Sequence, residues 1–163
     1  MSVVLYPGSF DPFHLGHLDV VNQAAVLFGE VIIGVMHNPE KSSATFSVDQ
    51  RIAMIEESVK HLPSISVQAF AGLAVDAAKS CRALCILKGL RTMSDFELEQ
   101  QMAQTNFLIS GVRTVYVPCA PALGFISSRF IREIAHFGGD TSAMVPSAVG
   151  NVLNKTYPPR SKK

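Results

Sequence analysis

Five short, continuous apolar segments alternate along the chain with segments of helical periodicity, and this alternation constrains the fold more than any other feature. The apolar segments span residues 3–6, 31–36, 65–70, 83–87 and 114–117. They are rich in Val, Ile and Leu, which is typical of strands buried on both faces of a parallel sheet. We therefore expect five such strands.

Helical patterns fill the intervals between these strands and the end of the chain. They predict helices over residues 15–28, 47–62, 73–80, 94–109, 128–137 and 146–155. The first helix ends at Gly29, a residue suited to a helix C-cap. Capping boxes mark the starts of the second and fourth helices, and Ser94 and Glu97 form the second box. Phe107 and Phe137 are expected in the core.

Strands that alternate with helices predict the fold class. The expected fold is α/β: a single Rossmann-like domain whose doubly wound, parallel five-stranded sheet has helices on both faces. The length of 163 residues suits one domain. We expect this domain over residues 1–157 and a basic, flexible tail over residues 158–163. Ligands on such sheets bind beyond the carboxyl ends of the strands, where the strand order reverses.

Composition and charge exclude several classes of function. The formal net charge is +1, so no global charge draws the protein to nucleic acid or to an anionic membrane. Cys81, Cys85 and Cys119 have neither CxxC nor metal-ligand spacing, so we expect small buried side chains rather than a redox or metal site. No apolar run reaches membrane-spanning length and no signal-peptide pattern opens the sequence, so we predict a cytoplasmic location.

Residues 6–17 (YPGSFDPFHLGH) connect the first predicted strand to the first helix, where α/β folds bind phosphates. Gly8 permits close approach of the backbone to a ligand, and Ser9 offers a hydroxyl and an N–H group. His14 and His17 share one face of the helix start, beside the positive end of the helix dipole. We predict a polyphosphate site here, and we expect Asp11 to accept a local, Asx-type backbone hydrogen bond.

This segment resembles the (T/H)xGH signature of the nucleotidyltransferase superfamily, whose members transfer a nucleotidyl group from a nucleoside triphosphate. Residues 125–133 (FISSRFIRE) resemble the superfamily's ISSxxxR motif. Residues 88–104 (KGLRTMSDFELEQQMAQ) are similar to a segment peculiar to the phosphopantetheine adenylyltransferases, and Lys88 and Arg91 are expected just past the end of a strand. With residues 38–41 (NPEK), the resemblance covers nearly the whole chain.

The resemblance implies transfer of the adenylyl group from ATP to 4′-phosphopantetheine, which gives 3′-dephospho-coenzyme A and pyrophosphate in coenzyme A biosynthesis. It also implies Mg²⁺ carried with the ATP phosphates, no metal site made by the protein, a homohexamer, and feedback inhibition by coenzyme A. The implied acceptor is a phosphate monoester, whose second pKa near ~6 makes it an anionic nucleophile at neutral pH. Because no general base is then needed, we expect catalysis by positioning and electrostatic stabilisation.

The same resemblance assigns roles to individual residues. His17 would be the catalytic residue that stabilises the transition state, and Lys41 and Lys88 would position the acceptor phosphate. Ser9 and the backbone of Ala74 would also contact the acceptor. The residues implied in ATP binding are Ser9, Phe10, His17, Gly89, Leu90, Arg91, Glu99, Leu123, Gly124, Phe125, Ile126, Ser127, Ser128 and Arg129.

Three positions depart from the phosphopantetheine adenylyltransferase pattern. His14 stands where that family usually has threonine, and histidine there is more typical of nicotinate or nicotinamide mononucleotide adenylyltransferases. Lys88 stands where many members have arginine, so a point charge replaces a bidentate donor. Residues 122–125 (ALGF) replace an aromatic-Ser-Phe pattern.

Three other functions are alternatives to adenylyl transfer to 4′-phosphopantetheine. A mononucleotide adenylyltransferase is favoured by His14 and opposed by the 88–104 segment, and the same segment opposes a cytidylyltransferase. The third alternative is a non-catalytic nucleotide-sensing module. It would be expected to lack His17, Lys41 or Arg91, and all three are present.

Overall fold

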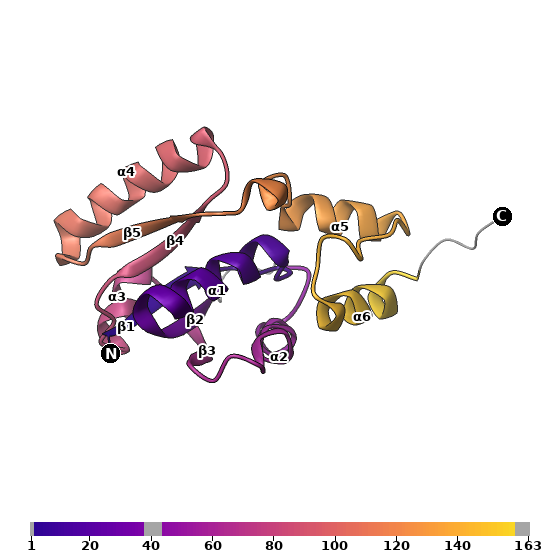
Figure 1. The fold of residues 1–163 in the computed structure, drawn as a ribbon, viewed down its shortest axis with the longest axis horizontal. Coiled ribbons are helices and arrows are strands. Elements are labelled where there is room, and N and C mark those ends of the chain that lie inside the picture. Colours follow the sequence, from indigo (N-terminus) through magenta and orange to yellow (C-terminus); the bar gives the residue numbers. More distant parts are fainter. Residues whose placement is uncertain (1, 38–43, 159–163) are drawn as a thin grey trace.

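The computed structural model describes residues 2–37 and 44–158, which form one five-stranded sheet in the order β3-β2-β1-β4-β5 (Figure 1). All neighbouring strands are parallel. The strands are β1 (Ser2–Gly8), β2 (Gly29–His37), β3 (Ile65–Ala71), β4 (Ile86–Leu90) and β5 (Thr114–Pro118). The predicted doubly wound parallel sheet is confirmed, and its order reverses between β1 and β4.

Six α-helices and one 3₁₀ turn connect and follow the strands in the described part of the chain. They are α1 (Leu15–Phe28), α2 (Val48–Val59), α3 (Ala74–Ser80), α4 (Met93–Ser110), η1 (Pro121–Leu123), α5 (Ser128–His136) and α6 (Ser147–Thr156). Each predicted helix is confirmed, with bounds that differ by a few residues. None of the described helices is long and apolar enough to cross a membrane.

Helices cover both faces of the sheet, and the core is divided accordingly. Val4 and Ile33 belong to the larger cluster, which α1, α2, α5 and α6 complete. Leu5 and Ile86 belong to the smaller cluster, to which α3 contributes Val75. Val4 and Leu5 enter different clusters because successive side chains of a strand point to opposite faces of the sheet.

The fourth strand lies later in the chain than predicted. It spans Ile86–Leu90 instead of 83–87, and Leu84 is exposed. Backbone pairing with β5 extends the strand, since Lys88 lies opposite Tyr116 and Gly89 opposite Val117. Lys88 is therefore in the strand itself, and only Arg91 lies just past its end.

The start of α4 also differs from the prediction. Thr92, not Ser94, is the N-cap, and its hydroxyl accepts the N–H of Asp95 at 3.2 Å. An Arg91–Asp95 ion pair at 2.9 Å holds the same turn. The predicted capping box of Ser94 and Glu97 is therefore wrong, because the cap forms two residues earlier.

Burial is lower at the sheet edges than the apolar pattern indicated. No residue of β3 is fully buried, because β3 is an edge strand with a neighbour on one side only.

The predictions of Phe107 and Phe137 as core residues are wrong: they are 42% and 59% exposed. Phe107 instead lies under the Arg113 guanidinium, 3.9 Å from the ring centroid.

The three cysteines are free thiols, and only one of them is buried. Burial raises the pKa of the Cys85 thiol. Cys81 and Cys119 are half-buried, so the expectation of buried side chains holds for Cys85 alone. The predicted boundary between the domain and its tail falls at the end of the described residues and stays a prediction.

Candidate active site

A cavity of about 430 Å³ opens at the carboxyl ends of β1 and β4, where the strand order reverses. This is the position predicted for a ligand on such a sheet. Its lining comes from β1, the β1–α1 loop, the first turn of α1, β4 and the turn after it, α4 and the start of α5: Tyr6, Pro7, Gly8, Ser9, Phe10, His14, His17, Lys88, Gly89, Arg91, Asp95, Glu99, Ser127, Ser128, Arg129 and Arg132.

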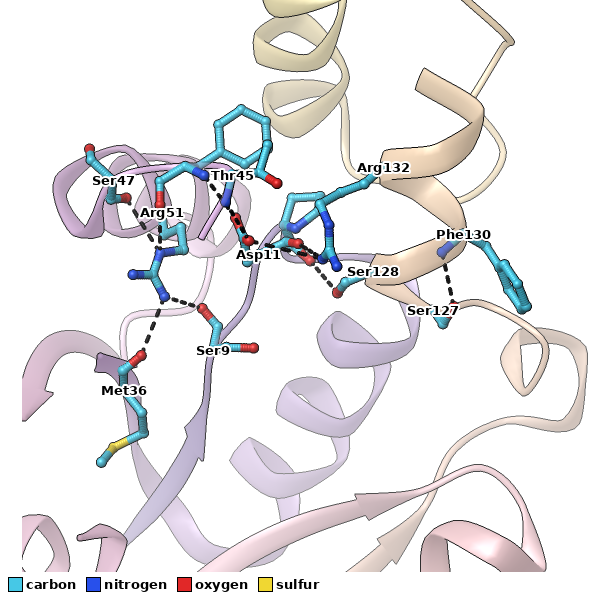
Figure 2. A network of polar contacts seen from close by, with 12 residues as sticks. Ser9, Asp11, Met36, Thr45, Ser47, Arg51, Ser127, Ser128, Phe130 and Arg132 are labelled. Carbon is cyan, nitrogen blue, oxygen red and sulfur yellow. Dashed lines mark hydrogen bonds and ion pairs between the residues drawn. The ribbon is translucent and has the colours of Figure 1, made fainter. Parts of the chain in front are cut away.

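Asp11 ties the β1–α1 loop to the start of α2 (Figure 2). Its carboxylate accepts the backbone N–H of Thr45 at 2.8 Å and of Phe46 at 2.9 Å. The expected backbone hydrogen bond is thus present, but it is not a local Asx turn. Donors more than thirty residues away take the place of the loop's own N–H groups.

The start of α5 is held against the same loop (Figure 2). Ser128 donates its hydroxyl to the Pro12 carbonyl at 2.8 Å, and Arg132 donates to the Asp11 carbonyl. The Arg132 guanidinium also lies 4.0 Å from the Asp11 carboxylate. Ser127 caps the helix by accepting the Phe130 N–H at 3.2 Å. The helix N-terminus is therefore fixed beside the cavity.

His14 and His17 cap the first turn of α1 reciprocally. The Nδ1 atom of His17 accepts the His14 N–H at 3.2 Å, and the Nδ1 atom of His14 accepts the His17 N–H at 3.3 Å. The rings stack with centroids 3.5 Å apart and planes 20° apart. With both Nδ1 atoms used as acceptors, a neutral imidazole carries its proton on Nε2.

Both imidazoles are held neutral by their surroundings. Burial, with a smaller contribution from the Arg91 charge, lowers the pKa of His14 to about 3. Burial lowers the pKa of His17 well below its usual range, and His14 and Arg91 add to this effect. Phe10 and Phe13 enclose His17, with ring centroids 5.0 and 5.5 Å away. At neutral pH the pair therefore offers hydrogen-bond donors without a net charge.

Two cationic side chains of the cavity, at the end of β4, are paired with carboxylates. Lys88 contacts Glu99 at 3.1 Å. Arg91 contacts Asp95 at 2.9 Å and donates to the Ile126 carbonyl at 2.8 Å. A phosphate that binds here would compete with these carboxylates for the two cations.

Gly8 and His14 of the predicted polyphosphate site line this cavity, and so do ten of the residues to which the resemblance assigns a role. These ten are Ser9, Phe10, His17, Lys88, Gly89, Arg91, Glu99, Ser127, Ser128 and Arg129. Leu90, Leu123, Gly124, Phe125 and Ile126 do not line it: Ile126 is buried and Phe125 is 70% exposed. Ala74 begins α3 and packs against the smaller core cluster. Lys41 lies outside the described residues.

Sequence reasoning assigned no role to two charged residues of the cavity, Asp95 and Arg132. The signal for Asp95 was its spacing of four from Arg91, which favours an ion pair once the turn at the start of the helix includes both residues. Arg132 is the last residue of the quoted ISSxxxR pattern and lies one helical turn after Ser128. Among the described residues, no three His, Cys, Asp or Glu side chains are grouped to hold a metal ion.

Comparison with known proteins agrees with this architecture. Residues 5–134 match the cytidylyltransferase-like family. Two crystal structures of a bifunctional NMN adenylyltransferase/ADP ribose pyrophosphatase from Francisella tularensis are similar in fold. The one complexed with AMP and a manganese ion has 18% identity and a TM-score of 0.71, over 95% of this chain and 48% of that chain. The other has 19% identity and a TM-score of 0.72, over 94% and 49%.

This chain thus spans about half the length of those two structures, and identity this low shows a shared fold alone. The family match is broader, because it covers most of the chain, including the β1–α1 loop, β4 and nearly all of α5. The chain therefore belongs to the cytidylyltransferase-like family, within the nucleotidyltransferase superfamily.

Proposed function

We propose that this protein transfers the adenylyl group of ATP to 4′-phosphopantetheine and releases pyrophosphate. Membership of the cytidylyltransferase-like family supports nucleotidyl transfer in general. The observation that carries the proposal is the cavity itself, which brings His17 of the first motif together with Lys88 and Arg91 of the 88–104 segment. That segment resembles the phosphopantetheine adenylyltransferases, and its residues line the same cavity as the general signature.

The proposed reaction needs no base from the protein. A phosphate oxygen of the acceptor, already ionised at neutral pH, attacks the α-phosphorus of ATP. A new P–O bond forms, the bond between the α-phosphorus and the bridging oxygen breaks, and its electron pair leaves with pyrophosphate. What the site must supply is alignment of two anions and stabilisation of the charge that develops on the phosphoryl oxygens.

The residues of the cavity have chemistry suited to these tasks. His17 would donate its Nε2–H to an α-phosphate oxygen, which a neutral imidazole can do. Arg91 would bind the ATP phosphates and Lys88 the acceptor phosphate, each at the expense of its present carboxylate partner. Ser127 and Ser128 lie at the N-terminus of α5, where exposed N–H groups and the helix dipole favour anions.

Several finer points belong to the proposal. The roles of Lys41, Ala74 and the 123–126 loop stay predictions, as do Mg²⁺ delivered with ATP, the homohexamer, the cytoplasmic location and inhibition by coenzyme A. The carboxylate pairs suggest how charge is balanced before ATP arrives: Lys88 and Arg91 each have a partner that a phosphate could replace.

A nicotinate or nicotinamide mononucleotide adenylyltransferase is the second candidate. It is favoured by His14, and the two similar structures carry the name of an NMN adenylyltransferase. Its acceptors are also phosphate monoesters, so the same cations and the same histidine would serve. The two candidates differ only in what the acceptor presents beyond its phosphate.

Pyrophosphate release from MgATP tests both candidates, with 4′-phosphopantetheine, nicotinate mononucleotide and nicotinamide mononucleotide as separate acceptors. Release with phosphopantetheine alone would support the proposal, and release with a mononucleotide alone would replace it by the second candidate. ATP binding without release from any acceptor would indicate the nucleotide-sensing module.

The activity must also depend on the described cavity. His17→Ala should abolish most of the release, whereas His61→Ala, which changes an exposed histidine outside the cavity, should not. Equal activity of the two variants would place the reaction elsewhere.

A further inference from the structure

Arg51 of α2 is a buried arginine, with 4% of its surface exposed, that contacts Ser9 of the cavity lining. Within the described chain its guanidinium donates to backbone carbonyls alone: Nη1 to Ser9 at 2.6 Å and to Met36 at 3.3 Å, and Nε to Phe46 at 3.1 Å and to Ser47 at 3.4 Å (Figure 2). Over residues 2–37 and 44–158 it has no carboxylate within ion-pair distance. A buried charge without a counter-ion requires an explanation.

The bond to Ser9 fixes the orientation of one peptide group. In a trans peptide the C=O and the N–H point in opposite directions. Because the Ser9 carbonyl faces Arg51, the N–H of Phe10 faces away from Arg51. Ser9 and Phe10 both line the cavity. Within the described chain, the Phe10 N–H has no hydrogen-bond partner.

The backbone at Phe10 is held in an unusual conformation. Its φ is 48°, a left-handed value that a side chain larger than glycine rarely adopts. Such a conformation persists only where the surroundings hold it, and residues of this kind cluster at binding sites. The short bond from Arg51 holds one end of this residue, and burial of the Phe10 ring at 2% exposure holds the other.

Arg51 also joins three separate pieces of backbone. Ser9 follows β1, Met36 lies near the end of β2, and Phe46 precedes α2. One rigid, planar group thus sets the relative positions of two strand ends and a helix start. Its positive charge lies next to Ser9 of the cavity lining and would attract an anion bound there.

We infer that Arg51 is a positioning residue for polyphosphate binding: it aims the free N–H of Phe10 into the cavity and supplies a buried positive charge next to Ser9. The inference rests on the proposed function in one respect, that phosphates of a nucleotide occupy this cavity. Arg51 lies outside the sequence motifs. Its part is in binding the phosphates of the nucleotide, and it has none in binding the nucleoside.

Inorganic tripolyphosphate and adenosine, measured separately by calorimetry on the full chain, test this division. Arg51→Lys keeps the charge but loses the planar fork, so the Ser9 carbonyl and the Met36 and Phe46 carbonyls can no longer all be engaged. We expect the dissociation constant for tripolyphosphate to rise about tenfold, as for loss of one charge-assisted contact, with adenosine binding unchanged.

Ile55→Val is the matched control for stability. It trims a fully buried side chain on the same helix and leaves Arg51 in place. If Ile55→Val lowers the melting temperature as much as Arg51→Lys does but keeps tripolyphosphate binding, then the loss of binding in Arg51→Lys comes from the changed side chain and not from lower stability. Equal losses of tripolyphosphate binding in both variants would overturn the inference, because destabilisation of α2 would then explain them.

A measurement on the unaltered protein does not depend on how the variants fold. Tripolyphosphate should shift the NMR resonances of the Phe10 amide and the Arg51 Nε–H, and leave that of Arg113, an exposed residue just before β5, unchanged. Binding without these shifts would overturn the role of Arg51 and leave the proposed function intact. Absence of tripolyphosphate binding to the unaltered protein would overturn both.

Discussion

The imidazoles of His14 and His17 stack with their centroids 3.5 Å apart, and each Nδ1 accepts the backbone N–H of the other residue. This reciprocal cap fixes both rings at the start of α1 and uses neither Nε2 atom. Burial and the neighbouring Arg91 charge lower the pKa of both imidazoles and keep them neutral, so the two rings can lie this close together. The cavity therefore gains donors without mutual repulsion.

We expect His17→Ala to lower kcat by about 10² to 10³ with a much smaller change in ATP affinity, since a donor aimed at developing charge acts mainly in the transition state. The comparison of kcat with the dissociation constant of ATP from calorimetry is decisive. A parallel loss in both would mean that His17 serves ground-state binding.

Protonation of the histidine pair should destabilise the protein in acid. The pKa of His14 is about 3 in the folded protein and near 6.5 when exposed, so between these values the unfolded state binds the extra proton. The free energy of unfolding should therefore fall as pH is lowered from about 6.5 to about 3, with a slope near 1.4 kcal/mol per pH unit from His14 alone. Urea titrations across this range measure it.

The matching variant is His14→Asn, which keeps a side-chain acceptor for the helix cap but does not titrate. Its slope over the same pH range should be lower than that of the unaltered protein. His61→Asn changes an exposed histidine and should leave the slope as it is. Equal slopes in all three proteins would refute the assignment to His14.

Lys88→Met should raise KM for the acceptor at least tenfold and change KM for ATP less, because the lost cation is the one proposed for the acceptor phosphate. The single variant also leaves the Glu99 carboxylate unpaired beside the cavity. The double variant with Glu99→Gln should therefore recover part of the acceptor binding. A larger rise in KM for ATP than in KM for the acceptor would reverse the proposed roles of Lys88 and Arg91.

Asp11→Asn should lower the free energy of unfolding by about 1–3 kcal/mol, because one carbonyl oxygen cannot replace two carboxylate oxygens that accept from Thr45 and Phe46. Urea unfolding of Asp11→Asn beside Glu56→Gln, an exposed residue of α2, measures the difference. No loss relative to that control would show that the link between loop and helix is dispensable for stability.

Much of the site could be predicted because its residues are local in sequence. The 6–17 segment places Ser9, His14 and His17 at the end of a strand and the start of a helix, and this order of strand, loop and helix follows from the segment itself. Asp11 was predicted to accept a backbone hydrogen bond, but its donors lie in another part of the chain. The choice of donor depends on how β1 and α2 pack, which no local pattern contains.

The errors at the sheet edge have a physical cause of the same kind. The apolar pattern of 65–70 predicts a strand but cannot show that it becomes β3, an edge strand with one neighbour and lower burial. Likewise, the end of β4 follows from its pairing with β5, since Lys88 is held opposite Tyr116 whatever its own side-chain preference.

The sequence alone determined the parallel α/β fold and the order of its elements, and it predicts a phosphate site in the first loop, because periodicity, caps and turn residues act over short stretches of chain. Only the tertiary structure decided which charges meet: Lys88 with Glu99, Arg132 with the Asp11 loop, and Arg51 with the carbonyls of two strand ends. These contacts join segments far apart in the chain. Their distances are set by strand order and helix packing, which many sequences share and no single segment encodes.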